Sequence, residues 1–370
     1  MAHPHPHSVR LAACDCLTPF GDAAATHAAL LRDERALRPV PVLGASGGDL
    51  VPLALLAGRP LDEAAPPLWL PALQSLLAPL AGQGWGTARR PVYVTSSNFG
   101  VGNLHAFKLT ADPAHLAFST PVLSVERLRE AFGWGPSVTL LSHACVSAHL
   151  GLVQASRVVA AGLADAALVF SFDFLSPFVS GGFHALKILN DRFPAPYREG
   201  ETGSIGLGDG AGYAVLTRDT GDFVIAAQSL HNELHHFTAN QPDGAGFDAC
   251  LDPLRTAAAG RRLWLKGHGT GTLEAGRLEV NAFTRAFPSS PLVGWKGSLG
   301  HTLGSCGLVE LAVTCAALRE GRTPGTVGDG ATALHTDVAV TAFDNHAFDG
   351  VICASNAFGG AHAALLLSHA

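Results

Sequence analysis

The chain has 370 residues, of which 48% are hydrophobic and only 15% are charged, and its formal net charge is −6. This length allows a large buried core and predicts two domains or one duplicated domain. The acidic balance argues against a nucleic-acid-binding protein, because neutralising phosphates requires a basic surface.

The sequence shows no evident membrane span or secretion signal. The charge-free run 133–156 is interrupted by serines, histidines, a proline and a glutamine, which a bilayer tolerates poorly. The first residues, MAHPHPHSVRLAAC, contain no apolar stretch of signal-peptide length, so we expect a cytoplasmic protein. The 7 cysteines are odd in number and form no CxxC motif, which predicts reduced thiols.

The first half of the chain contains a predicted β-α-β unit. Residues 136–144 have the pattern of a short buried strand, Cys145–Gly162 carries apolar residues at helical spacing, and 165–173 is a second apolar strand. This order implies parallel strands with a helix packed across them.

The same alternation returns in the second half. We expect strands at 261–269 and 291–300, helices at 278–287 and 307–321, and two final strands within 349–369 joined by a Phe-Gly-Gly turn. No shift in composition marks a linker. The sequence therefore predicts a duplicated α/β fold whose halves, residues 1–218 and 219–370, meet near 217–223.

Cys145 lies at the predicted strand-to-helix junction, in SHACVSAHLG. A helix N-terminus favours the thiolate over the thiol, and the small neighbouring residues would admit a substrate carbonyl. A buried structural thiol fits the same pattern, because free cysteine is among the most buried residue types.

His268 lies in the glycine-rich loop of KGHGTGT, with Thr270 and Thr272 after it. The flanking glycines indicate a backbone approached closely by a ligand or by another segment, although a lone loop histidine is more often a surface residue. We interpret Lys266 as an ordinary charge at a strand end.

Lys296, His301 and Glu310 follow one another in WKGSLGHTLGSCGLVE. We place Lys296 and His301 on a strand and loop, and Glu310 within the next helix. A lysine and a carboxylate beside a histidine can hold the imidazole neutral and oriented. The alternative is that Lys296 and Glu310 simply form an ion pair.

Phe358 precedes two glycines in SNAFGGAHA. An aromatic residue in such a turn can act as a gate, and its backbone N–H can stabilise an oxyanion, but it can equally fill the core. Two further patterns are weak evidence for a binding site. HNELHH (231–236) lacks the HExxH order of zinc sites, and GLGDGAG (206–212) matches no nucleotide-binding motif.

Cys145, His268 and His301, in this order and within these segments, resemble the β-ketoacyl-(acyl carrier protein) synthases of the thiolase superfamily. The segments that carry the resemblance are HACVSAHLGLVQASRVVAAGLADAALV, GHGTGT, KGSLGHTLGSCGLVE and FGGAHA, supported by YREGETGSIGLGDGAGYAVL and HHFTANQPDGAG. The resemblance extends from about Val9 to Leu367 and implies a thiolase-like, duplicated α-β-α-β-α layered fold.

The resemblance also implies a reaction, the decarboxylative Claisen condensation of fatty acid, polyketide or polyene biosynthesis. Cys145 would carry an acyl group as a thioester, and His268 and His301 would promote decarboxylation of a malonyl thioester. The backbone N–H groups of Cys145 and Phe358 would form the oxyanion hole, with Phe358 as the gate, and Lys296 and Glu310 would support the site.

The substrates of such an enzyme are carried on the phosphopantetheine of an acyl carrier protein, so we expect no other cofactor and no metal. Thr270, Thr272 and Thr238 resemble the residues that contact the pantetheine. The resemblance further implies a homodimer, or a heterodimer with a related ketosynthase subunit.

Several residues depart from the family pattern. Gly276 stands where an aspartate is usual, although Glu279 is present, and Asn356 stands where a second phenylalanine is frequent. The chain is also short for the family, which indicates trimmed loops. Thiolase itself is less similar, because Cys353 comes too early to be its second cysteine.

Two alternative functions remain open. The chain resembles a chain-length factor, a non-catalytic partner of a ketosynthase, although such partners usually lack the nucleophile. An acyltransferase or thioester hydrolase would use Cys145 without condensation.

Overall fold

The computed structural model describes residues 8–57, 59–62, 69–200, 203–236, 239–328 and 332–370. Within them, the central sheet has ten strands in the order β11-β10-β14-β15-β9-β1-β8-β6-β4-β5. Five come from the first part of the chain: β1 (Val9–Leu17), β4 (Val92–Thr95), β5 (Val138–Leu141), β6 (Ala166–Asp173) and β8 (Gly210–Thr217). The other five are β9 (Phe223–Asn232), β10 (Leu263–Lys266), β11 (Leu292–Val293), β14 (Gly350–Ala357) and β15 (Ala361–His369).

The two sets of five strands have the same topology. In the first set β5, β4 and β6 are parallel neighbours, and β8 then pairs antiparallel with both β6 and β1. In the second set β11, β10 and β14 are parallel, and β15 pairs antiparallel with both β14 and β9. The sets join where β1 pairs with β9. The duplicated fold predicted from the sequence is therefore confirmed, whereas the division at residue 218 stays a prediction.

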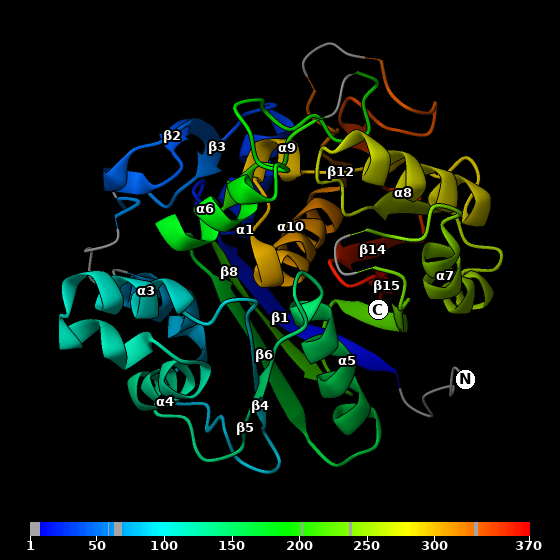
Figure 1. Cartoon of the computed structure of the whole chain (residues 1–370). Coiled ribbons are helices and arrows are strands. Elements are labelled where there is room, and N and C mark those ends of the chain that lie inside the picture. The colour runs from blue at the N-terminus through cyan, green and yellow to red at the C-terminus, as the bar shows by residue number, and fades with distance from the viewer. Residues whose placement is uncertain (1–7, 58, 63–68, 201–202, 237–238, 329–331) are drawn as a thin grey trace.

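The helices form the remaining layers. They are α1 (Ala23–Leu31), α2 (Trp69–Leu77), α3 (Val101–Thr110), α4 (Pro121–Phe132), α5 (Ser147–Ala160), α6 (Pro177–Ala185), α7 (Ala245–Ala257), α8 (Leu273–Ala286), α9 (Lys296–Leu299) and α10 (Cys306–Glu320). Helices α5 and α10 pack against each other and against strands of both sets, so they form the central layer. Figure 1 shows α3 and α4 to one side of this pair and α7 and α8 to the other.

Smaller elements complete the chain. The strands β2 (Arg38–Pro41), β3 (Leu50–Ala54) and β7 (Leu207–Gly208) form one minor sheet, and β12 (Arg322–Thr323) and β13 (Phe343–Asp344) another. Short 3-10 helices are η1 (Gly44–Ser46), η2 (Ala78–Leu80), η3 (Pro113–Phe118) and η4 (Leu303–Ser305). No helix in the described ranges is both long and apolar enough to cross a bilayer.

Strand β6 is covered on both of its faces. Its side chains alternate, with Ala167 and Val169 in the core around α5 and α10, and Leu168 and Phe170 in the outer core beside α2 and α4. All eight residues of β6 are buried. A strand covered on both faces needs apolar residues throughout, which explains its continuous apolar sequence.

The predicted elements mostly agree with the structure. The helix expected at 307–321 is α10, which ends before Gly321 in the left-handed conformation at φ 68°, as a C-terminal glycine commonly does. The strand expected at 291–300 was wrong in extent. Only Leu292 and Val293 are extended, because the chain then turns into the short helix α9, which begins at Lys296.

Candidate active site

Cys145 lies in the tight turn between β5 and α5. Ala144 before it has a positive φ of 44°, a conformation rare for alanine and found where a fold holds a strained functional turn. Ser147, the first residue of α5, closes the turn: its hydroxyl accepts from the His143 N–H (2.8 Å) and donates to the Ala144 carbonyl (2.6 Å). Cys145 is buried, at 9% exposure, and it lines a cavity that His268 and His301 also line.

The imidazole of His301 contacts this thiol directly. Its Nε2 lies 3.1 Å from Cys145 Sγ, while its Nδ1 accepts a hydrogen bond from the backbone N–H of Leu303 (3.2 Å). Burial first, and then the nearby charges of Lys296 and Lys266, hold the pKa of His301 well below its usual value. A neutral imidazole that accepts at Nδ1 carries its proton on Nε2. His301 therefore donates a hydrogen bond to the sulfur.

The protonation of Cys145 differs from the sequence prediction. We expected the helix N-terminus to favour the thiolate, but burial raises the pKa of the Cys145 thiol, and Cys306 adds to the rise. Lys296 acts in the opposite direction and does not offset burial. Removal from water penalises the charged form of a thiol more than a single helix end stabilises it. The resting site therefore holds a thiol.

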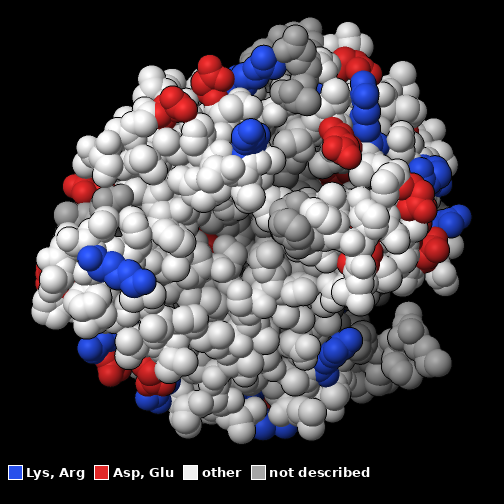
Figure 2. Space-filling model, in the orientation of Figure 1, with Lys and Arg blue, Asp and Glu red and all other residues white. Residues whose placement is uncertain are grey.

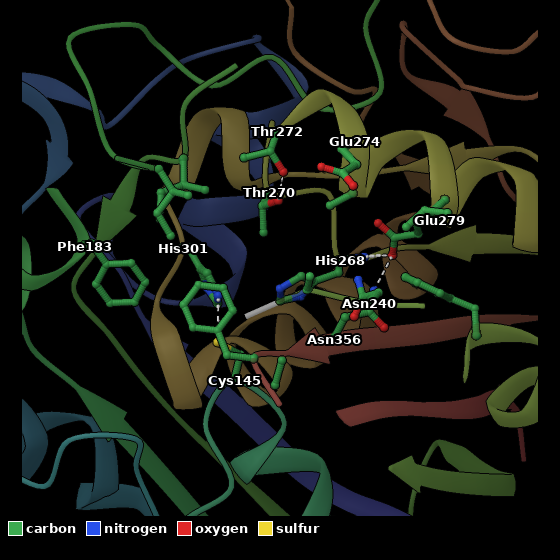
Figure 3. A pocket seen from close by; sticks show the side chains of 18 residues that line it. Cys145, Phe183, Asn240, His268, Thr270, Thr272, Glu274, Glu279, His301 and Asn356 are labelled. Atoms are coloured by element: carbon green, nitrogen blue, oxygen red, sulfur yellow. Dashed lines mark hydrogen bonds between the residues drawn. The ribbon is translucent and has the colours of Figure 1, made fainter. Parts of the chain in front are cut away.

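His268 lies beside His301, with the two ring centroids 4.9 Å apart and the planes nearly perpendicular. Its pKa is also held well below the usual value, chiefly by burial and then by Lys296. The loop that carries it requires glycine at Gly267, because a Cβ there would lie 2.1 Å from the Tyr197 hydroxyl oxygen. Figure 3 shows Cys145, His268 and His301 gathered around one cavity.

Glu279, on α8, holds the His268 loop in place. Its carboxylate accepts hydrogen bonds from the backbone N–H groups of His268 and Gly269, the latter at 3.0 Å, and from the Tyr197 hydroxyl at 2.8 Å. The side-chain amide of Asn356 donates to the same carboxylate at 3.3 Å. Asn356 thus ties the β14 end to the histidine loop, which a phenylalanine in its place cannot do.

Lys296 and Glu310 lie behind the histidines and form a buried ion pair of 2.7 Å. The structure adds Lys266, whose ammonium contacts the other oxygen of Glu310. Our interpretation of Lys266 as an ordinary strand-end charge was therefore wrong, since it is only 1% exposed. The sequence hides this contact because Lys266 and Glu310 are 44 positions apart.

Phe358 begins the turn between β14 and β15, and its ring stacks on that of Phe183 from α6, with centroids 6.0 Å apart. At 39% exposure it does not fill the core. Phe183 is a site residue that the sequence analysis missed, because it lies outside every motif recognised there. Both rings line the cavity, which has a volume of about 240 Å³.

Thr270 and Thr272 line another wall of this cavity, with their hydroxyl oxygens 3.4 Å apart. Thr238, the third residue expected to contact pantetheine, lies outside the described residues. The HNELHH segment does not gather a metal site: over the described ranges, no three His, Cys, Asp or Glu side chains come together as possible ligands.

The comparisons with known proteins agree with this geometry. Residues 223–328 match the model of the family described as "Beta-ketoacyl synthase, C-terminal domain". A 3-oxoacyl-[acyl-carrier-protein] synthase 2 from Coxiella burnetii is 27% identical over 258 residues, which cover 63% of this chain and 62% of that protein. The chain is thus similar to the β-ketoacyl synthases, and residues 223–328 match the C-terminal domain of that family.

Two further relatives come from Arabidopsis thaliana and Streptomyces violaceoruber. The chloroplastic 3-oxoacyl-[acyl-carrier-protein] synthase II of Arabidopsis thaliana is 28% identical over 231 residues, covering 57% of this chain and 42% of that protein. A granaticin polyketide putative β-ketoacyl synthase 1 from Streptomyces violaceoruber is 27% identical, covering 69% of this chain and 68% of that protein. The aligned parts of the Coxiella and Arabidopsis relatives are thus less than two thirds of their lengths.

Solved structures show that the likeness in fold is complete. A ketosynthase in complex with its chain length factor from Xenorhabdus doucetiae matches with a TM-score of 0.82 at 19% identity, covering 100% of both chains. A β-ketoacyl synthase from Burkholderia phymatum matches with a TM-score of 0.81 at 20% identity, covering 98% of this chain and 100% of that one. The thiolase-like fold expected from the sequence is therefore confirmed.

Proposed function

We propose that the protein is an active β-ketoacyl-(acyl carrier protein) synthase. It would extend a carrier-bound acyl chain by two carbons through decarboxylative Claisen condensation with a malonyl thioester. One observation supports this most: the Cys145 sulfur lies 3.1 Å from the protonated nitrogen of a neutral His301, with His268 beside it in the same cavity.

The first step is transfer of the acyl group to Cys145. The sulfur attacks the carrier thioester, a new sulfur–carbon bond forms, and the bond to the pantetheine sulfur breaks. Because His301 is already protonated at Nε2, it acts here as a hydrogen-bond donor to the attacking sulfur and not as its base. Because the thiolate is the nucleophile, the thiol gives up its proton as the sulfur attacks, and that proton ends on the departing pantetheine sulfur, so charge balances.

The second step uses both imidazoles as donors. The malonyl thioester loses carbon dioxide, and the electron pair of the broken carbon–carbon bond moves onto the thioester carbonyl as an enolate. Neutral N–H donors placed at that oxygen stabilise the developing charge. The enolate carbon then attacks the acyl carbon on Cys145. Backbone N–H groups of Cys145 and Phe358 are proposed to hold the oxyanion. When it collapses, the Cys145 sulfur is expelled as a thiolate and takes up one proton from solvent, which restores the resting thiol.

The walls of the cavity support a long, flexible substrate arm. Thr270 and Thr272 offer hydroxyl groups along one wall, as recognition of the polar amides of phosphopantetheine requires. Phe183 and Phe358 form an apolar pair above the thiol. We infer that an acyl carrier protein delivers both substrates, and that a second ketosynthase chain, identical or related, completes the assembly.

A chain-length factor is the main alternative, and the site itself disfavours it. Such a subunit has no use for a thiol and two neutral imidazoles in contact within a cavity. A hydrolase or a simple acyltransferase would need the cysteine and one imidazole, whereas here the second imidazole, Lys296 and Glu310 are also assembled.

Intact mass spectrometry after incubation with a panel of acyl carrier thioesters tests the proposal. We expect one acyl group per chain, lost in Cys145→Ala and kept in Cys250→Ala, which removes another buried thiol. Adding malonyl carrier protein should then release carbon dioxide and a β-ketoacyl product. Absence of acylation in folded protein would favour the chain-length factor, and acylation without carbon dioxide release would favour the acyltransferase.

A further inference from the structure

A buried cluster of two lysines and one glutamate lies behind the two histidines. Glu310 on α10 contacts Lys296 through Oε1 and Lys266 through Oε2. Each lysine is 1% exposed and Glu310 is 3% exposed. The mechanism above uses Lys296 and Glu310 as support, and it leaves Lys266 without a role.

Lys266 is held at a defined place in the sheet. It is the last residue of β10, where it pairs with Val293 on one side and with Cys353 on the other. His268 follows two residues later, so the strand end that places the ammonium also begins the histidine loop. Lys266 thus links Glu310, through its ammonium, to the backbone that leads to His268.

The charge of the cluster is unusual for a protein interior. One lysine would suffice to neutralise Glu310, and each further buried ion carries a desolvation cost. The other carboxylates near the site have different partners. Glu279 accepts from backbone, hydroxyl and amide donors, and so does Asp173, which accepts from Ser96, Ser97, Asn98 and Gly304.

Three imidazoles face this cluster from different elements: His149 on α5, His268 after β10 and His301 before α10. Burial is the first cause that lowers the pKa of each, and the charge of Lys266 lowers all three further. For His149, which takes no part in the proposed reaction, the pKa falls to about 4 with Lys266 as the second cause. The other titratable groups near the cluster are the thiols of Cys145, Cys306 and Cys353, the carboxylate of Glu279 and the hydroxyl of Tyr197.

We propose that Lys266 is a positioning residue of the condensation site: it occupies the second oxygen of Glu310, which fixes Lys296, and its positive charge opposes a second proton on His268 and His301. Both imidazoles then stay neutral in mildly acidic conditions, so Nδ1 of His301 continues to accept from the Leu303 N–H. The role rests on the proposed condensing function, since only a reaction that needs two neutral imidazoles benefits from the extra cation.

Replacing Lys266 by methionine tests the charge while keeping the length of the side chain. Without the ammonium, the imidazoles bind protons more readily, so their pKa values rise. Activity that needs neutral imidazoles is then lost at a higher pH as the solution is acidified. We expect the acid limb of malonyl decarboxylation to move up by about one pH unit, whereas Lys266→Arg, which keeps a cation, should restore part of the shift.

The decisive readout is histidine NMR, because it does not depend on catalysis. The full chain is labelled at the histidine Cε1 carbon, and His149 and His301 are assigned from His149→Gln and His301→Gln. In Lys266→Met both signals should titrate at higher pH than in the unsubstituted chain. If His149 and His301 titrate in Lys266→Met at the same pH as in the unsubstituted chain, the proposal is overturned, even if the protein proves to be an active synthase. If decarboxylation is absent from the unsubstituted chain, the proposed function fails while this readout still stands.

Two further variants separate charge from damage to the fold. Arg59→Met removes the cation of another largely buried ion pair, with Asp209, and should lower stability without moving the His149 or His301 titrations. Lys266→Met combined with Glu310→Gln removes one charge of each sign, so the titrations should return toward those of the unsubstituted chain. A double variant that titrates like Lys266→Met alone would contradict the electrostatic role.

Discussion

The two halves of the sheet share one topology but differ in the residues that follow their strand ends. In the C-terminal set, the ends of β10, β11 and β14 lead to His268, His301 and Phe358, which line the cavity. In the N-terminal set the end of β5 leads to Cys145, and the segment after β6 adds the ring of Phe183 but no reacting group. Although the fold is duplicated, most of the reacting groups therefore come from the C-terminal half.

The matching strand ends of the N-terminal set are tied to each other instead. Asp173, at the end of β6, accepts hydrogen bonds from Ser96 Oγ (2.6 Å), Ser97 N–H (2.9 Å) and Asn98 N–H (3.2 Å), all of which follow β4. A further donor comes from the other half, because the Gly304 N–H donates to Asp173 at 2.7 Å. Gly304 adjoins Leu303, whose N–H orients His301. The N-terminal half therefore acts as the frame for the C-terminal one.

Removing an imidazole from the catalytic half should have the largest effect. We expect His301→Ala to lower malonyl decarboxylation by about 10²–10³-fold, because a preorganised donor at the developing oxyanion is lost. Acylation of Cys145 should persist, as measured by intact mass. The exposed His346→Ala serves as control. Loss of acylation with decarboxylation retained would reverse the roles assigned to the two steps.

Weakening the frame should have an intermediate effect. Asp173→Asn keeps the shape but turns an amide group toward N–H and O–H donors, so we expect a loss of about 1–3 kcal/mol in the free energy of unfolding. Urea denaturation measures it. Asp222→Asn, at an exposed ion pair with Arg319, should change stability by less than about 1 kcal/mol. Equal losses in both variants would show that Asp173 is no special anchor.

The smallest effect on stability is expected at the gate. Phe358→Ala removes a half-exposed ring whose stacking on Phe183 is worth about 0.5–1.5 kcal/mol, so the unfolding free energy should change little. The rate of Cys145 acylation, followed by quenched-flow mass spectrometry, should change several-fold more than the stability loss explains. The control is Phe178→Ala, which also removes an exposed ring but lies on α6. An equal change in the rate of Cys145 acylation in both variants would show that Phe358 is not a gate.

The sequence was most informative where function depends on local segments. Strand, loop and helix are consecutive around Cys145, His268 and His301, and parallel pairing of β10 with β11 puts the two histidine loops at neighbouring strand ends. Cys145 follows β5 at the opposite edge of the sheet, and it meets the histidines through the packing of α5 against α10. It was least informative where partners are distant. Nothing near Lys266 indicates burial against Glu310, and Phe183 reaches Phe358 only through the docking of α6. The strand containing β11 was predicted too long, because an apolar run does not separate a strand from a short buried helix.

The central core around α5 and α10 has a consequence for folding. It takes Val169 from β6 and Val351 from β14, so each half alone would expose the apolar side chains that the other covers. The sulfur–imidazole contact spans 156 positions of the chain, and contacts of such sequence separation close late because loop closure is entropically costly. We expect separately expressed halves to aggregate rather than fold, and the reactive centre to be among the last parts of the native structure to form during refolding.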